Sequence, residues 1–160
     1  MDSTILTKCR GITGSGKTAS LRLFLTQVLW LSAHSKKEFK LAEQSKALST
    51  VLDSFGNAKT LMNPNASRHG RYLELHFNDR GRFGGAKVLT FGLDKSRLSR
   101  LTHEECTYHE FYQFLAGATP AERDAFNLED PSEYALLASS GCYHLPSGPF
   151  SDDSIAMTAP

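Results

Sequence analysis

A glycine-rich stretch near the start of the chain has the residue types and spacing of a phosphate-binding loop. Residues 11–18 read Gly-Ile-Thr-Gly-Ser-Gly-Lys-Thr and match the pattern G-x-x-x-x-G-K-[ST]. Glycines let backbone N–H groups curl around phosphate oxygens, and the next helix directs its positive dipole end at the same anion. The lysine can reach the β- and γ-phosphates, and the threonine hydroxyl can coordinate Mg²⁺. The candidate nucleotide-binding residues are Gly11, Ile12, Thr13, Gly14, Ser15, Gly16, Lys17 and Thr18.

The elements beside this loop test the interpretation. The apolar residues of 18–35 cover more than one stripe, which predicts a helix buried on several sides. A strand should precede the loop, but only Ile5 and Leu6 favour one, and residues 8–10 are polar. A glycine-rich turn that matches the pattern by chance is the alternative.

The middle of the chain predicts a second helix followed by a hairpin. Residues 36–55 have amphipathic spacing, and Gly56 is a candidate left-handed C-cap. A polar loop is expected over 57–71. Strands over 72–77 and 87–91, joined by a turn at 78–81, complete the hairpin. The helix residues expected to point inward are Leu41, Leu48, Val51, Leu52 and Phe55.

Helix-start signals dominate the remainder. Thr102 and Glu105 form a capping-box pattern that predicts a helix through Leu115. Thr119-Pro120 predicts a second helix start, and a short helix is expected over 134–138. A loop then follows, and Asp152-Asp153 is typical of a further helix start.

Several ordered blocks resemble one family. Residues 63–71 read NPNASRHGR and resemble the switch I loop of the myosin motor domain, N-x-N-S-S-R-F-G-K. Similar blocks, in the family's order, are FGNAKT at 55–60, YLELHF at 72–77, LDKSRL at 93–98 and YHEFYQFLAG at 108–117. The resemblance implies an α/β fold, namely a partial P-loop NTPase core of a myosin-like motor domain.

The resemblance also implies roles by position. Asn63, Ser67 and Arg68 match the switch I residues of the catalytic site, with Ser67 joining Thr18 as a Mg²⁺ ligand and ATP as the nucleotide. Arg68 matches an arginine that pairs with an acid of switch II. Because no D-x-x-G-x-E motif occurs, we expect no acidic partner for it in this chain. Ala66 replaces the family's serine beside the γ-phosphate, which favours an alternative: a non-hydrolysing tether or interaction module.

A narrower resemblance concerns the parent protein. Residues 63–82, 91–101 and 111–143 resemble the myosin-like domain that precedes the glycosyltransferase of fungal chitin synthases. This implies actin as a partner of a complete motor only, and a membrane only through the fused synthase. It also implies a parent at the plasma membrane or secretory vesicles of growing tips and septa. We expect residues 14–157 to be the motor-like fragment, inactive alone, with 1–13 and 158–160 as truncated ends.

Composition excludes other classes. The net charge is +1, so no strong field favours nucleic acid or an anionic membrane, and one RGG-like stretch at 80–85 fits a hairpin turn better. The 160 residues suit one domain of a soluble, cytoplasmic chain. Cys9, Cys106 and Cys142 form no motif, which favours free thiols in a reducing compartment. The spacing of His103, Cys106 and His109 lacks a fourth ligand for zinc.

Overall fold

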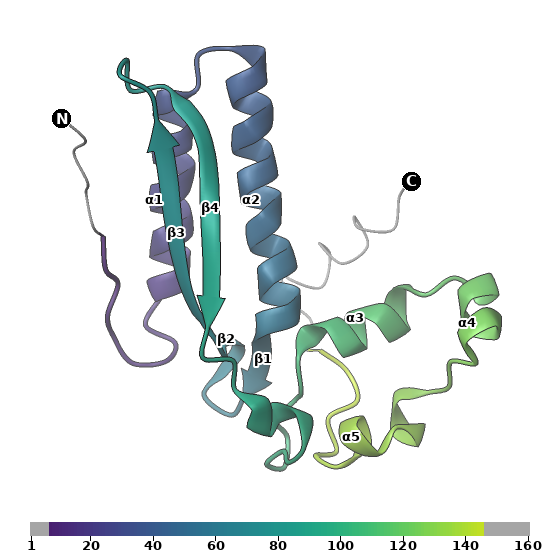
Figure 1. Cartoon of the computed structure of the whole chain (residues 1–160). Helices are drawn as coiled ribbons and strands as arrows, with labels where there is room; N and C mark the ends of the chain where they lie inside the picture. The colour runs from purple at the N-terminus through teal and green to yellow at the C-terminus, as the bar shows by residue number, and fades with distance from the viewer. Residues whose placement is uncertain (1–6, 146–160) are drawn as a thin grey trace. The chain divides into compact units, whose positions relative to one another are not determined.

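The computed structural model describes residues 7–145. The strand expected at Ile5 and Leu6 and the helix expected from Asp152 lie outside this range. The chain divides into two compact units: one takes residues up to 46 together with 74–87, and the other takes residues 47–73 and those from 88 onward. Each is described by itself below, with labels as in Figure 1.

The first unit begins with α1 (Lys17–Ser32), which confirms the predicted helix. Its buried residues are Leu25, Leu29 and Ser32, so the apolar side chains form one buried stripe. The expectation of burial on several sides is wrong for the described chain, since Trp30 is 64% exposed. The fold brings packing partners to one side of this helix only.

The helix α2 (Lys36–Gly56) starts at a cap that sequence analysis missed. The Glu38 carboxylate accepts hydrogen bonds from the backbone N–H groups of His34 and Ser35, at 2.7 and 2.9 Å. The Ser35 hydroxyl accepts in return from the Glu38 N–H at 3.3 Å. This reciprocal pair is a capping box, and it fixes where α2 begins.

The inward face of α2 differs from the prediction. Leu48 and Phe55 are exposed, whereas Asp53 and Ser54 are buried. Burial of an acid is tolerated here because the Arg71 guanidinium lies 3.9 Å from the Asp53 carboxylate. The buried face of α2 therefore includes an ion pair, whereas the apolar pattern predicted that Leu48 and Phe55 would be buried.

The strands β3 (Gly70–Phe77) and β4 (Phe83–Phe91) form the predicted hairpin, shown in Figure 1. The Asn78 side chain accepts from the N–H groups of Arg80 and Arg82, both at 3.0 Å, and Gly81 supplies a left-handed residue at φ 70°. The strand β4 begins at Phe83 rather than at residue 87. Phe83 is 2% exposed, and its ring lies 6.1 Å from that of Phe77.

A second hairpin replaces the polar loop expected over 57–71. The strands β1 (Asn57–Thr60) and β2 (Asn63–Ser67) pair antiparallel, with Asn57 opposite Ser67. Gly56 lies inside the end of α2, and it is not among the glycines with positive φ, so the left-handed cap is a wrong prediction. A Cβ on Gly56 would overlap the His69 imidazole, so the position requires glycine for close approach.

The rest of the second unit holds short helices. These are η1 (Lys95–Leu98), α3 (His109–Gly117), α4 (Pro120–Phe126), η2 (Pro131–Glu133) and α5 (Ala135–Ala138). The helix α4 begins where Thr119-Pro120 predicted, with a capping box between Thr119 and Glu122, and α5 matches the short helix expected over 134–138.

The helix expected from Thr102 is wrong, since α3 starts at His109. The Glu105 carboxylate does not return to a helix start: it pairs with Arg97 at 2.9 Å and accepts from the Leu61 N–H at 3.3 Å. Cys106 donates its N–H to the carbonyl of Lys59 at 3.1 Å. These long-range bonds hold the segment extended against β1.

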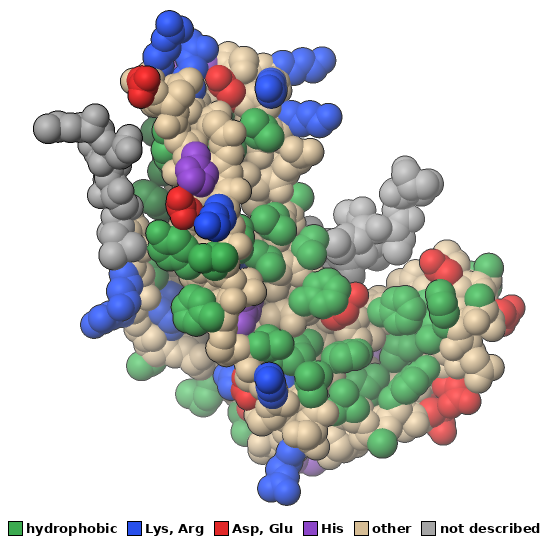
Figure 2. Space-filling model, in the orientation of Figure 1, with side chains coloured by type: hydrophobic (Ala, Val, Ile, Leu, Met, Phe, Trp, Pro, Cys, Tyr) green, Lys and Arg blue, Asp and Glu red, His purple; other side chains and the backbone are tan. Residues whose placement is uncertain are grey.

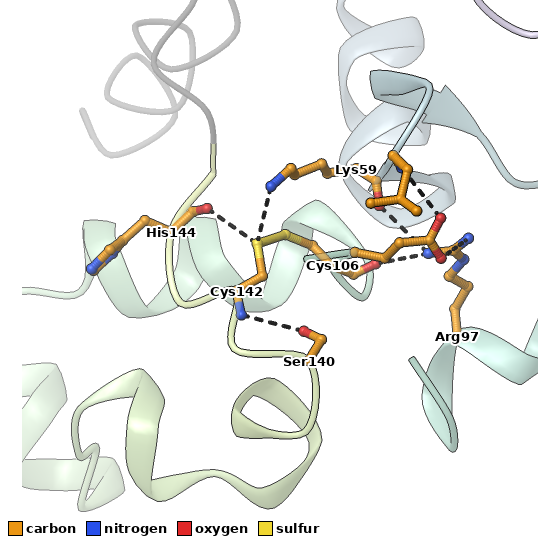
Figure 3. Close-up of a disulfide and its surroundings, with 8 residues drawn as sticks. Lys59, Arg97, Cys106, Ser140, Cys142 and His144 are labelled. Atoms are coloured by element: carbon orange, nitrogen blue, oxygen red, sulfur yellow. Dashed lines mark hydrogen bonds and ion pairs between the residues drawn. A yellow bond between two sulfur atoms is a disulfide. The ribbon is translucent and has the colours of Figure 1, made fainter. Parts of the chain in front are cut away.

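The core of the second unit contains a disulfide, so the expectation of free thiols is wrong for two of the three cysteines. Cys106 and Cys142 are bonded, with a Cα–Cα distance of 5.8 Å, and Cys9 is free and exposed. Figure 3 shows the pair beside Lys59, whose Nζ lies 3.8 Å from the Cys142 sulfur. Tyr112, Leu115 and Leu137 pack around it. The disulfide ties the segment after α5 to the residues beside β1.

Hydrophobic side chains remain exposed on α3 and α4. Figure 2 shows them gathered there, and the ring centroids of Phe114 and Phe126 lie 6.3 Å apart.

Among the described residues, no helix combines the length and hydropathy that crossing a lipid bilayer requires.

Candidate functional site

The glycine-rich loop leads directly into α1. Gly14 and Gly16 have φ angles of 76° and 82°, a left-handed backbone that glycine adopts without steric cost. Gly16 is the N-cap of α1, and the Ser20 N–H donates to its carbonyl at 2.8 Å. Lys17 is therefore the first helical residue and Thr18 the second, which are the positions that the sequence pattern predicts.

The charges at the N-terminus of α1 favour the binding of an anion. No acidic residue occupies the first turn of α1, so the N-terminal dipole has no neutralising carboxylate there. The Lys17 ammonium donates to the carbonyls of Gly11 and Ile12, at 2.7 and 2.5 Å. The lysine is thus held at the mouth of the loop, where it adds a positive charge to the helix end.

The second group of candidates lies on the β1–β2 hairpin, in the other unit. Ser67, at the end of β2, is exposed, and the Arg68 N–H continues the hydrogen bonding by donating to the Gly56 carbonyl at 2.8 Å. Asn63 sits at the tight end of the hairpin, bonded through its N–H and its carbonyl to the Thr60 hydroxyl, both at 3.1 Å. One hairpin therefore carries all three candidates, Asn63, Ser67 and Arg68.

The Asn63 side chain has a defined orientation. Its Oδ1 accepts from the Asn65 N–H at 3.0 Å. Because a backbone N–H can only donate, the oxygen must be the atom at this position. The Asn63 amide nitrogen keeps its two donors for other groups, and donors of this kind bind phosphate oxygens.

Three polar side chains meet at one oxygen atom, from β1, β2 and α3. Asn57 donates from Nδ2 to Asn65 Oδ1 at 2.9 Å, and His109 Nε2 lies 3.0 Å from the same oxygen. The oxygen already accepts one hydrogen bond and cannot donate, so the His109 ring must donate from Nε2. Burial lowers the pKa of His109 to about 4, which keeps the ring neutral at neutral pH.

The acid that pairs with Arg68 is Asp94. Both Nε and Nη2 of Arg68 donate to Asp94 Oδ2, at 3.2 and 2.6 Å. Hydrogen bonds from Ser96, and next the one from Arg68, lower the pKa of Asp94 to about 2. The expectation that Arg68 has no acidic partner in this chain is therefore wrong. The partner lies in the 93–98 block, not in a switch II motif.

Ala66 has a packing role in this hairpin. Its side chain is 2% exposed, and it pairs with Ala58, which is fully buried. Side chains of neighbouring residues in a strand point to opposite faces, so Ala66 and Ser67 face different ways. The structure thus gives a reason for a methyl group at position 66.

The predicted site residues fall into two groups. Residues 11–18 belong to the first unit, and Asn63, Ser67 and Arg68 to the second. Sequence analysis missed Asn57, Asp94 and His109, although each lies in a block that resembles the family. Between residues 7 and 145, no His, Cys, Asp and Glu side chains cluster to hold a metal. The candidate ligands Thr18 and Ser67 offer hydroxyl groups, which Mg²⁺ accepts beside phosphates.

Comparison with known proteins points to a single family. The myosin head (motor domain) family matches residues 2–158. Myosin-1 of Arabidopsis thaliana is 39% identical over 135 residues, which cover 84% of this chain and 11% of the relative. Myosin-I heavy chain of Dictyostelium discoideum is 37% identical over 135 residues, covering 84% and 6%. Myosin-1 of Sclerotinia sclerotiorum is 37% identical over 134 residues, covering 83% and 11%. The chain spans a small part of the length of these relatives.

Proposed function

This chain belongs to the myosin motor-domain family, and from that premise we propose that it binds Mg·ATP through residues 11–18, with the β1–β2 hairpin carrying the residues that resemble switch I. The observation that carries the proposal is the start of α1. Left-handed glycines place Lys17 and Thr18 at a helix N-terminus whose first turn holds no acid. Backbone N–H groups, an ammonium and a hydroxyl at such a place are the donors that a polyphosphate and its Mg²⁺ need.

The β1–β2 hairpin carries candidate residues of its own. Asn63 offers amide donors to phosphate oxygens, and the exposed Ser67 hydroxyl is a second ligand for Mg²⁺. Arg68 is held by Asp94 and orders the end of the strand that carries Ser67. Catalysis at such sites consists of positioning and charge stabilisation around the metal.

A magnesium titration tests Thr18 and Ser67 as metal ligands. ATP binding is measured at fixed ATP while Mg²⁺ is varied, with Thr18→Ala and Ser67→Ala as variants and the exposed Ser99→Ala as a control. We expect either site variant to need at least about tenfold more Mg²⁺ for half-maximal binding, as the loss of one ligand contact costs roughly 1.4 kcal/mol. An unchanged magnesium requirement in both variants would contradict the proposal.

The second candidate is a motor-like tether that binds ATP without turnover, and Ala66 favours it. The family's serine is absent beside the γ-phosphate, and the buried methyl at this position packs against β1. Single-turnover phosphate release from the chain and from Ala66→Ser separates the two. Release by the unsubstituted chain supports an ATPase. Release by the serine variant alone supports the tether. Actin co-sedimentation of the complete parent protein would then separate a motor from a non-motor role.

We also propose a chitin synthase as the parent protein, on the blocks at 63–82, 91–101 and 111–143 alone. This assignment implies chitin biosynthesis, with a fused glycosyltransferase as the only membrane part, at the plasma membrane or vesicles of growing tips and septa. Sequencing the full transcript tests it. A reading frame that continues into a glycosyltransferase supports the assignment, whereas one that continues into a myosin neck and tail overturns it.

A further inference from the structure

We propose that His109 is a positioning residue for the nucleotide site, which sets the orientation of Asn63 by holding Asn65 through a hydrogen bond from Nε2. The proposal rests on the function proposed above, because its consequence is the presentation of the hairpin to Mg·ATP. His109 is the first residue of α3, and Asn65 lies in the middle of β2.

The first step is the convergence of two donors on one oxygen. Asn57 is fully buried and His109 is 7% exposed, and both donate to Asn65 Oδ1, at 2.9 and 3.0 Å. Asn65 is half-buried, so the loss of one of these donors costs part of the hydrogen-bond energy of its side-chain oxygen. The Asn65 side chain is therefore fixed by partners from two elements, β1 and α3.

The second step connects Asn65 to the side chain of Asn63. The Asn65 N–H donates to Asn63 Oδ1 at 3.0 Å. The position of Asn65 thus sets the position of the side-chain oxygen Oδ1 of Asn63, and the side-chain nitrogen of Asn63 must point away from the Asn65 N–H. Release of Asn65 would free this amide group to rotate, with both of its donors leaving their place.

The third step concerns the choice of histidine. The ring must donate from Nε2 without a positive charge next to the neutral asparagines. Burial lowers its pKa, and the N-terminal dipole of α3 also disfavours a cation at this residue. His109 Nδ1 is buried and has no hydrogen-bond partner among the described residues. The proton is thus placed on Nε2, where Asn65 accepts it.

A spectroscopic measurement tests this geometry without any nucleotide. In the ¹⁵N-labelled chain at pH 7, the two-bond ring correlations of His109 report which nitrogen carries the proton. We expect a neutral ring protonated at Nε2, and faster exchange of the Asn65 amide in His109→Leu than in the unsubstituted chain. A ring protonated at Nδ1, or an Asn65 amide that exchanges equally fast in both proteins, would overturn the proposal.

Rescue by a conservative variant separates positioning from packing. Glutamine places an amide donor near the position of Nε2, whereas leucine fills the space without a donor. We expect His109→Leu to weaken Mg·ATP binding about threefold to tenfold, the value of one buried neutral hydrogen bond. His109→Gln should stay within about threefold of the unsubstituted chain. His103→Leu, at an exposed position, is the control and should bind normally.

The outcomes distinguish this proposal from the proposed function. Equal weakening by leucine and glutamine assigns His109 a packing role and overturns the proposal. If the unsubstituted chain binds no Mg·ATP, the proposed function fails, and the ring correlations together with the Asn65 exchange rates still judge the positioning role. If His109→Leu does not fold, the glutamine variant and the ring protonation of the unsubstituted chain decide.

Discussion

The Arg68 guanidinium contacts a single carboxylate oxygen of Asp94 through two nitrogens, at 3.2 and 2.6 Å. A backbone hydrogen bond also joins the two residues, because the Asp94 N–H donates to the Arg68 carbonyl at 2.9 Å. Ser96 binds the other carboxylate oxygen through its N–H and its hydroxyl, at 3.2 and 2.5 Å. The end of the β1–β2 hairpin is therefore anchored to the segment before η1 by side chain and backbone together.

Breaking this anchor should lower the stability of the chain. The two side chains are 29% and 25% exposed, so solvent screens the pair only in part. We expect Asp94→Asn to lower the free energy of unfolding by about 1–2 kcal/mol, measured in urea. Asp79→Asn, at an exposed turn position, is the matched control and should change it by less than about 0.5 kcal/mol. Equal effects of the two variants would contradict the anchoring role.

The titration of His109 should make stability depend on pH. The pKa of His109 is about 4 in the folded chain, against an ordinary value of 6.5, so between these values the unfolded chain binds more protons than the folded chain. The free energy of unfolding should therefore fall as pH drops from 6.5 to 4, by about 3 kcal/mol in all from this group. Asp94, with a folded pKa of about 2, adds its own loss only at lower pH.

Urea unfolding at a series of pH values checks this dependence, and His109→Gln isolates it. The glutamine variant should lose most of the slope between pH 4 and 6.5, because no ring remains to titrate. His103→Gln, at an exposed histidine, should keep it. An equal slope in the unsubstituted chain and in His109→Gln would show that other groups cause the acid sensitivity.

The disulfide between Cys106 and Cys142 should stabilise the second unit. It closes a loop over a sequence separation of 36, for which chain entropy predicts about 3–4 kcal/mol. We expect a thiol reductant to lower the free energy of unfolding by an amount of this order, and Cys9→Ser to leave it unchanged. Maleimide labelling of the native, unreduced chain should modify Cys9 alone. Labelling of Cys106 or Cys142 under these conditions would contradict the bond.

Gly56 should not tolerate a larger side chain. A methyl group there would overlap the His69 ring, which contacts the Gly56 carbonyl at 3.1 Å. Although alanine favours a helix, we expect Gly56→Ala to destabilise the chain by about 1–3 kcal/mol, because a close-packed neighbour must move. Gly85→Ala adds a methyl into open space and is the control. The midpoint of thermal unfolding is the measurement, and a Gly56→Ala midpoint at or above that of the control would count against this packing.

Local signals account for the parts of the fold that the sequence predicted. The helices α1, α2 and α4 follow from apolar spacing and from caps such as Thr119 with Glu122, which lie within a turn of one another. The extended segment before α3 was missed, because Glu105 bonds Leu61 and Arg97 rather than a helix start. Propensity yields to such tertiary contacts.

The candidate site divides in the same way. The loop at 11–18 and the residues Asn63, Ser67 and Arg68 were found from motifs of fixed spacing. Sequence analysis missed Asp94 and His109 as partners of the hairpin. Asp94 contacts Arg68 across 26 residues of sequence, and His109 contacts Asn65 across 44. No periodicity or cap indicates such a pairing, so these two residues could be assigned to the site only from the three-dimensional fold.

Isothermal titration calorimetry of Mg·ATP binding to the chain tests residues 11–18 as a nucleotide site, with Lys17→Ala and the exposed Lys37→Ala compared side by side. We predict saturable binding by the unsubstituted chain and by Lys37→Ala. Lys17→Ala should lose at least about tenfold in affinity, since a charge-assisted contact to phosphate is worth roughly 1.5–3 kcal/mol. Equal binding by all three proteins, or no binding by a folded unsubstituted chain, would contradict the proposed nucleotide site.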